Sequence, residues 1–176
     1  NQIPDKVEEI LKNDDENTKS HKYIMNAVYR ENAQRNYLLE GLSKAQDDDL
    51  ILISDVDEIP NFENFNLDSI KEKIILFEQD MFYYKFNLKL PDIKWIGTKA
   101  CKKKNFKNPQ WLRNIKDRKY PFYRIDTLFS KNKYIDVKIL NNGGWHFTNI
   151  KRPEEIEYKM RSYLHHREFD LKPINL

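Results

Sequence analysis

The spacing of apolar and polar positions along the chain predicts a helix followed closely by a buried strand. Between Tyr29 and Gln46, apolar and small side chains recur at i, i+1, i+4, i+5 and i+8, which places them on one helical face. The acidic residues at 47–49 end this helix, and the apolar run LILIS at 50–54 follows without polar alternation. Such a run is typical of a strand covered on both faces in a parallel sheet. We therefore expect an α/β layered fold.

The rest of the pattern predicts mostly extended segments before a final helix. Residues 74–90 are rich in aromatic and β-branched side chains but are interrupted at 78–80, which favours two strands. Pro153, followed by Glu154 and Glu155, is expected to open a helix that reaches about His165, because proline and acids both favour a first turn. Short helices are expected at 3–11 and 109–115, a turn at 12–20, and further extended segments at 94–101, 120–129 and 138–148.

Composition narrows the class of protein. With 176 residues, 39% hydrophobic and 13% aromatic, the chain is predicted to fold as a single domain spanning 1–176. The single cysteine, Cys101, excludes an internal disulfide and a multi-cysteine zinc site, so we expect a cytoplasmic location. No apolar run approaches the roughly 20 residues of a membrane-spanning helix, and no signal-peptide pattern opens the chain. Because the first residue is Asn1 rather than methionine, we expect the full protein to be longer.

Charge is distributed unevenly, although the net charge is only +3. Residues 47–58 carry six acids and no base, whereas residues 94–119 carry ten bases and one acid. An acidic and a basic region close together suit a cation and a phosphate-bearing ligand. The alternative is that most of these lysines simply form a solvated face.

The carboxylates that follow the predicted strand form a candidate metal site. In an open α/β sheet, ligands bind beyond the carboxyl ends of strands, where Asp55, Asp57 and Glu58 lie. In an extended chain Asp55 and Asp57 would face the same side while Val56 packs inward. Their hard oxygen atoms suit Mg²⁺ or Mn²⁺, which keep coordination positions open for substrate phosphates. The alternative is a solvated acidic turn that ends at Pro60.

A second candidate segment lies later in the chain. Gly143 and Gly144 form its only Gly-Gly pair, which indicates a need for backbone freedom or for close approach, for example by a diphosphate. His146 is either a metal ligand or a histidine that hydrogen-bonds within the core. Trp145 is expected to pack or to offer a platform for a sugar ring.

Together these segments resemble glycosyltransferase family seventeen, which contains the bisecting β-1,4-mannosyl-glycoprotein β-1,4-N-acetylglucosaminyltransferase. Members show a Glu-x-x-Gln-Arg helix, a strand ending in Asp-x-Asp-Glu-Ile-Pro, and a Gly-Trp-His segment that leads into a helix opening with Pro-Glu. The matching residues here are Glu31, Gln34, Arg35, Asp55, Asp57, Glu58, Ile59, Pro60, Gly144, Trp145, His146, Pro153 and Glu154. The resemblance spans about Arg30 to Tyr163.

The resemblance implies a GT-A type fold, a UDP-sugar donor such as UDP-N-acetylglucosamine, and a divalent metal at the Asp-x-Asp motif. An earlier strand that helps to form the nucleotide pocket in that family is not found in this chain. We therefore expect a GT-A fold that lacks its first strand or strands.

Roles for individual residues follow as hypotheses. Arg35 could contact the donor diphosphate and Gln34 and Asn36 the uridine, although an arginine on an exposed helix face usually only solvates. Inverting glycosyl transfer also needs a carboxylate that takes the acceptor proton. Glu154 and Glu155 are the first candidates for this base, and Asp126 and Glu168 are the secondary ones. Acids at a helix start are more often structural. The expected donor-binding residues are Gln34, Arg35, Asn36, Asp55, Gly144 and Trp145, and the expected metal ligands are Asp55, Asp57 and His146.

The leading hypothesis is therefore an inverting, metal-dependent transferase that moves N-acetylglucosamine from its UDP donor to a glycan acceptor, with Mn²⁺ or Mg²⁺ as cofactor. Nucleic acid is not an expected partner. A nuclease or nucleic-acid-binding protein that grips phosphates through Lys99 to Lys107 is the main alternative. A transferase-like domain that binds without turnover is the third.

Overall fold

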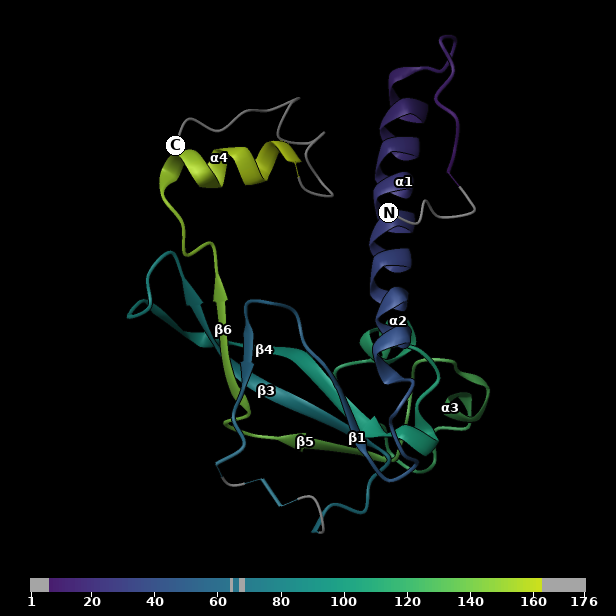
Figure 1. Ribbon diagram of the computed structural model, residues 1–176, viewed down its shortest axis with the longest axis vertical. Coiled ribbons are helices and arrows are strands. Elements are labelled where there is room, and N and C mark those ends of the chain that lie inside the picture. Colours follow the sequence, from purple (N-terminus) through teal and green to yellow (C-terminus); the bar gives the residue numbers. More distant parts are fainter. Residues whose placement is uncertain (1–6, 64, 67–68, 163–176) are drawn as a thin grey trace. The chain divides into compact units, whose positions relative to one another are not determined.

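The computed structural model describes residues 7–63, 65–66 and 69–162 (Figure 1). The contacts divide the chain into two compact units, 1–38 with 151–176, and 39–150, and each is described by itself. The expectation of a single domain stays a prediction. None of the helices in the described ranges combines the length and the apolar character that crossing a membrane requires.

The first unit contains α1 (Glu16–Tyr37) and α4 (Pro153–Ser162). Asp15 is the N-cap of helix α1, and its side chain accepts a hydrogen bond from the Thr18 amide at 2.7 Å. The predicted turn is confirmed at 12–13, but its remainder and the start of the helix near Tyr29 were wrong, because the N-cap lies earlier in the chain. Residues 7–11 are not helical, so the described part of the helix expected at 3–11 is absent. Helix α4 begins at Pro153 as predicted, and its expected end near His165 lies outside the described residues.

Helix α1 ends at Tyr37, and the rest of the predicted helix is a 3₁₀ helix at Leu38–Leu42 followed by a turn and loop at 43–46. Leu42 and Ala45, two of the predicted face residues, pack against the core of the second unit. The helical spacing did not reveal the change from α-helix to 3₁₀ helix. Over a single turn, both conformations place residues three or four apart on similar faces.

The second unit is built on a six-stranded mixed sheet with the order β1-β4-β3-β6-β2, in which β5 pairs with β3. β3 runs antiparallel to β4 along one side. Along its other side lie β5 and then β6, both parallel to it and end to end. The bounds are β1 Leu50–Ile53, β2 Glu58–Pro60, β3 Ile74–Tyr83, β4 Lys89–Lys102, β5 Val137–Leu140 and β6 Gly144–Thr148.

β1 is not the parallel strand that its apolar run predicted. It pairs antiparallel with β4 at one end of the sheet order. Its run is apolar because both of its faces are covered. Ile51 and Ile53 enter one hydrophobic cluster, while Leu50 and Leu52 pack against a second cluster around Phe77. The prediction that both faces of this strand are covered is confirmed, but the predicted parallel pairing is wrong.

β3 is a single strand, so the break expected at 78–80 was wrong. The polar residues there are accommodated by partners on β4. Gln79 donates to Thr98 at 3.1 Å, and Asp80 accepts from Lys89 at 2.7 Å. The register between β3 and β4 shifts on either side of this segment, which marks an irregularity where the sequence suggested an interruption.

The segment at 120–129 was expected to be extended but forms turns and the short helix α3 (Asp126–Phe129). The Thr127 hydroxyl donates to the Arg124 carbonyl at 2.6 Å, a local bond that competes with strand pairing. The predicted helix at 109–115 is confirmed as α2 (Pro109–Asn114), which the Asn108 side chain caps by accepting from the Trp111 amide at 2.7 Å. β4 and the pair β5 and β6 confirm the extended segments at 94–101 and 138–148 in the main.

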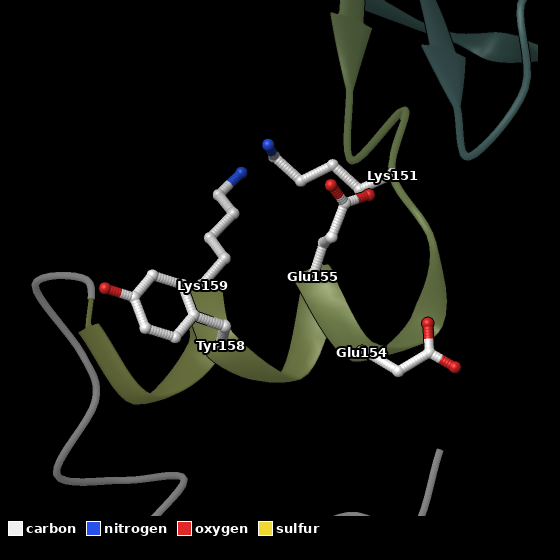
Figure 2. Close-up of a pocket in the computed structure, with 5 residues that line it drawn as sticks. All are labelled: Lys151, Glu154, Glu155, Tyr158 and Lys159. Atoms are coloured by element: carbon white, nitrogen blue, oxygen red, sulfur yellow. The ribbon is translucent and has the colours of Figure 1, made fainter.

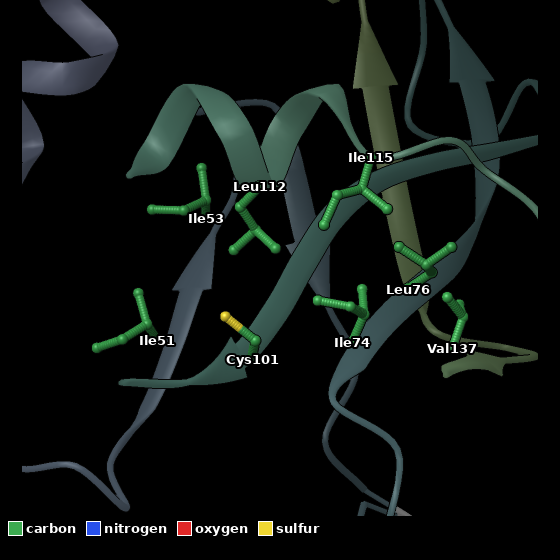
Figure 3. Packing of buried hydrophobic residues seen from close by; sticks show 8 residues of the cluster. All are labelled: Ile51, Ile53, Ile74, Leu76, Cys101, Leu112, Ile115 and Val137. Carbon is green, nitrogen blue, oxygen red and sulfur yellow. The ribbon is translucent and has the colours of Figure 1, made fainter. Parts of the chain in front are cut away.

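The larger hydrophobic cluster lies between α2 and one face of the sheet (Figure 3). It joins residues from β1, β3, β4, β5 and the end of α2: Ile51, Ile53, Ile74, Leu76, Cys101, Leu112, Ile115 and Val137. Burial raises the pKa of the Cys101 thiol to about 12, so this group stays protonated at neutral pH and does not act as a nucleophile. The α/β class expected from the sequence is confirmed, with a mixed and curled sheet.

Candidate functional site

Asp55 and Asp57, two of the three expected metal ligands, lie in a tight turn between β1 and β2. The Glu58 amide donates to the Asp55 carbonyl at 3.0 Å, which closes the turn, and Val56 at its tip is fully exposed. The expectation that an extended chain aims Asp55 and Asp57 to one side while Val56 packs inward was wrong. A turn rotates successive side chains away from one another, so the two aspartates make separate contacts.

Glu58 lies at the centre of a buried polar network and is only 5% exposed. Its carboxylate accepts from Trp95 Nε1 at 2.9 Å and from the Asp55 amide at 3.0 Å. It also lies 3.4 Å from the Thr98 hydroxyl. Trp95 and Thr98 belong to β4, which is three strands away from β2 in the sheet order. In a flat sheet that separation would be about 14 Å. Glu58 can reach them only because the sheet curls.

Arg113, in α2, supplies the positive charge that balances this network. Its guanidinium contacts both oxygens of Glu58 at 3.2 and 3.3 Å and donates to Asp55 Oδ2 at 2.6 Å. It also donates to the Gly97 carbonyl. A buried carboxylate is costly unless it is paired and hydrogen-bonded, and Arg113 with Trp95 provides both. Asp55, an expected metal ligand, is therefore engaged by a protein cation.

Asp57 turns the other way and meets His146 on β6. The distance from Asp57 Oδ2 to His146 Nε2 is 3.5 Å. The backbone holds the pair in place, because the Phe147 amide donates to the Asp57 carbonyl at 2.8 Å and Glu58 is the register partner of His146 in the β2–β6 ladder. Two of the three expected metal ligands are thus brought together from distant parts of the sequence.

The His146 ring is held in place by its neighbours, but one of its two nitrogen atoms lacks a hydrogen bond within the described part of the chain. It is 7% exposed and stacks on Trp95, with ring centroids 4.9 Å apart. Its Nδ1 is buried and has no hydrogen-bond partner in the described part of the chain. A buried polar atom without a partner costs free energy, and in native proteins such atoms often mark a functional site.

Two glycines are required where the network and the ladder approach closely. A Cβ on Gly97 would lie 1.9 Å from Glu58 Oε1. Gly144 has a φ of +131°, and a Cβ there would lie 2.0 Å from the Ile59 carbonyl. The predicted need for close approach at the Gly-Gly pair is explained at Gly144 by the backbone of β2.

Asp57 in the turn and His146 on β6 are spaced as two protein ligands of one divalent cation would be. Donors at bonds of about 2.0–2.2 Å from one cation lie about 3.0–3.5 Å apart, and the Asp57–His146 separation of 3.5 Å agrees. No cluster of three or more His, Cys, Asp or Glu side chains suited to a metal occurs among the described residues. Mg²⁺ and its relatives are commonly bound by one or two carboxylates together with substrate phosphates.

Trp145, an expected donor-binding residue, is not part of this cluster. Trp145 precedes His146 on β6, so its side chain lies on the opposite face, where it is partly exposed. Gln34, Arg35 and Asn36 lie on α1 in the first unit, where Arg35 donates to Glu31 at 2.7 Å. Their roles at a donor site stay predictions.

The candidate general bases, Glu154 and Glu155, line a shallow hollow on the first turns of α4, with Lys151, Tyr158 and Lys159 (Figure 2). Glu155 accepts a hydrogen bond from the Arg152 amide at 2.9 Å, which is the helix-capping role that the sequence left open for it. Asp126 is ion-paired with Arg124 and Lys133, and these contacts, that with Arg124 above all, lower the pKa of its carboxyl. A carboxylate of lowered pKa is a weak base. Glu168 lies outside the described residues.

The basic stretch from Lys99 to Lys107 does not form a continuous phosphate-binding surface. Lys99 is buried, and its ammonium donates to the Arg113 carbonyl at 2.9 Å, to the Ile115 carbonyl and to Asp117. Burial lowers the pKa of this lysine. Lys102 and Lys104 both pair with Asp48. These contacts weaken the nucleic-acid alternative.

Sequence reasoning missed the partners that hold the site together. Glu58 was noted as part of a motif but not as a buried centre, and Arg113, Trp95, Thr98 and Ser54 were not singled out. The Ser54 hydroxyl donates to the Glu58 carbonyl at 2.9 Å. The one sequence signal was an arginine within a segment predicted to be a short helix, which does not identify its partner.

The chain was compared with protein families, with curated proteins and with solved structures. No family model, no curated protein and no solved structure matches it. The site therefore has to be interpreted from its own geometry.

Proposed function

We propose that this chain is the metal- and donor-binding part of an inverting glycosyltransferase of GT-A type, which transfers N-acetylglucosamine from a UDP donor to a glycan acceptor in β linkage. The observation that carries the proposal is the meeting of Asp57 with His146 at 3.5 Å beside a buried network. The sequence resemblance supports it, because these residues belong to the two motifs that the resemblance pairs.

The chemistry of such a transfer explains why this arrangement is suitable. A divalent cation neutralises the charge that develops on the departing nucleoside diphosphate. Asp57 and His146 would hold this cation, because one offers a hard oxygen and the other a neutral nitrogen. The remaining coordination positions would be left for diphosphate oxygens and water.

The buried network has a supporting role in this proposal. Glu58 and Arg113 fix the turn that carries Asp55 and Asp57, so the Asp57 carboxylate is held before any ligand arrives. Trp95 fixes the His146 ring from one face. A site held in this way loses little side-chain entropy when a ligand binds.

A second candidate is a transferase-like domain that binds without turnover. The contact between Arg113 and Asp55 favours it, because a protein cation engages the first aspartate of the motif. In that case Asp57 would contribute nothing to nucleotide or metal binding.

Addition of Mn²⁺ and UDP together is expected to raise the melting temperature of the chain by about 5–10 °C at saturating ligand. The estimate combines about 2.7 kcal/mol at a hundred-fold excess over Kd with about 2–4 °C per kcal/mol for a chain of this size. Asp57→Asn is expected to abolish the increase, because it removes a negatively charged ligand. Differential scanning fluorimetry measures both.

Asp92→Asn is the matched control, since Asp92 is an exposed aspartate on β4. This variant should keep the full increase. An unchanged melting temperature of the unmodified chain with both ligands present would count against the metal site and the donor site alike. An increase that survives Asp57→Asn would remove Asp57 from the site.

A further inference from the structure

The loop at 116–133 exposes a concentration of apolar side chains that the proposed function does not use. Five of them lie within eight residues and are between 68% and 86% exposed: Phe122, Tyr123, Ile125, Leu128 and Phe129. Single exposed apolar residues are ordinary, but a group of this size on a soluble surface usually marks an interaction site.

The exposure belongs to a folded segment. Tyr120 and Thr127 are buried and anchor the loop at two points. The Lys116 amide donates to the Asn132 carbonyl at 2.8 Å, which ties the two ends of the loop together. The Leu128 amide donates to the Ile125 carbonyl at 3.0 Å within its short helix. The backbone therefore holds the apolar side chains outward.

Positive charge surrounds these side chains. The loop carries six basic and two acidic residues, a net charge of +4: Lys116, Arg118, Lys119, Arg124, Lys131 and Lys133 against Asp117 and Asp126. Asp117 accepts a hydrogen bond from the buried Lys99 at 2.5 Å. Within the described ranges no ion pair involves Lys116, Lys119 or Lys131, and all three are exposed. The excess charge is therefore directed to solvent.

We propose that the loop at 116–133 docks on the surface of an anionic lipid bilayer. Aromatic and aliphatic side chains enter the boundary between headgroups and acyl chains, while the surrounding lysine and arginine side chains contact anionic headgroups. Each basic residue near such a surface adds about 1 kcal/mol of attraction in typical membranes. The combination of both features in one anchored loop matches this kind of surface, and it is independent of the glycosyltransferase proposal.

Two other occupants fit less well. A symmetric contact between two copies of the loop would place two groups of charge +4 against each other, which is unfavourable. A single-stranded nucleic acid would use aromatic rings for stacking, but the aliphatic Ile125 and Leu128 offer no stacking surface.

Co-sedimentation of the full chain with lipid vesicles tests the proposal. We expect binding to vesicles of phosphatidylcholine mixed with phosphatidylglycerol, weak binding to phosphatidylcholine alone, and loss of binding at high salt, which screens the headgroup attraction. The double variant Phe122→Ser with Phe129→Ser is expected to bind anionic vesicles at least about tenfold more weakly, because it removes two rings that would insert into the bilayer.

Phe86→Ser is the matched control, since Phe86 is another highly exposed phenylalanine, in the turn between β3 and β4. It should bind vesicles as the unmodified chain does. Thermal melting shows that each variant is folded, which exposed positions allow. The proposal is overturned if the unmodified chain does not bind anionic vesicles. It is equally overturned if the double variant binds them as well as the Phe86→Ser variant does. It is also overturned if the double variant instead abolishes self-association or binding to single-stranded RNA.

Discussion

Replacing Glu58 by alanine is expected to lower the free energy of unfolding by about 3 kcal/mol or more. Glu58 is nearly inaccessible, and its carboxylate accepts hydrogen bonds from Trp95, Arg113 and the Asp55 amide. The substitution would leave buried donors without partners and remove one of the two carboxylates that balance Arg113. The expected loss lies near the lower end for a broken buried ion pair, because Asp55 keeps its contact with Arg113 at 2.6 Å.

Urea denaturation followed by circular dichroism measures this loss. Glu63→Ala is the matched control, because Glu63 is an exposed glutamate shortly after β2. It should change the free energy of unfolding by no more than about 0.5 kcal/mol. If Glu58→Ala were as mild as the control, the buried network would not be holding the turn, and the support it gives to Asp57 would have to be abandoned.

Gly144→Ala is expected to destabilise the fold by about 2–5 kcal/mol, from backbone strain and overpacking together. The residue has a φ of +131°, a conformation that side-chain-bearing residues rarely adopt. An added Cβ would also meet the Ile59 carbonyl at 2.0 Å, and a backbone atom cannot move aside without separating β2 from β6. Because β2 and β6 carry Glu58 and His146, the substitution should also weaken ligand binding at the turn.

Gly41→Ala provides the comparison for this effect. A Cβ at Gly41, which is in the 3₁₀ helix before β1, would meet no atom within 4 Å among the described residues beyond its own local backbone. This change should leave stability within about 1 kcal/mol, with a tendency towards stabilisation through the unfolded state. The same denaturation experiment compares the two glycines. Equal effects of the two substitutions would contradict the close approach described at Gly144.

The elements could be predicted wherever local sequence determines the backbone. The short helix predicted at 109–115 is α2, which begins with Pro109 after the capping Asn108, and Pro153 followed by two acids predicted the start of α4. The run at 50–54 correctly indicated a strand covered on both faces. It could not reveal pairing direction, because hydrophobic coverage comes from whatever packs on a strand, and here two separate clusters cover β1.

The errors at 78–80 and 120–129 arose where specific hydrogen-bond partners override the propensity of the segment. The polar residues at 78–80 do not interrupt β3, because Thr98 and Lys89 on β4 form hydrogen bonds with two of their side chains. The aromatic segment at 120–129 looks like a strand, yet it turns because Thr127 bonds locally and Tyr120 anchors it. Propensity is a weak guide where tertiary partners or side-chain-to-backbone bonds compete.

The candidate site was predictable only in part. The pairing of an Asp-x-Asp segment with a later histidine was a sequence hypothesis, and Asp57 does meet His146. A turn here was the alternative that the sequence left open, but the contact of Asp55 with Arg113 was not foreseen, because it depends on a guanidinium from a helix far along the chain. Buried networks of this kind are assembled by the tertiary fold, and no single segment contains enough of them to be recognised.

The most direct test of the central claim is a crystal structure of the chain soaked with UDP-N-acetylglucosamine and Mn²⁺, with the metal located by its anomalous signal. We predict one Mn²⁺ bound by Asp57 and His146 and bridged to the diphosphate of the donor. The proposed function would be contradicted if, at saturating concentrations, neither Mn²⁺ nor nucleotide were found at the turn between β1 and β2. It would also be contradicted if both were bound elsewhere, without contact to Asp57 and His146.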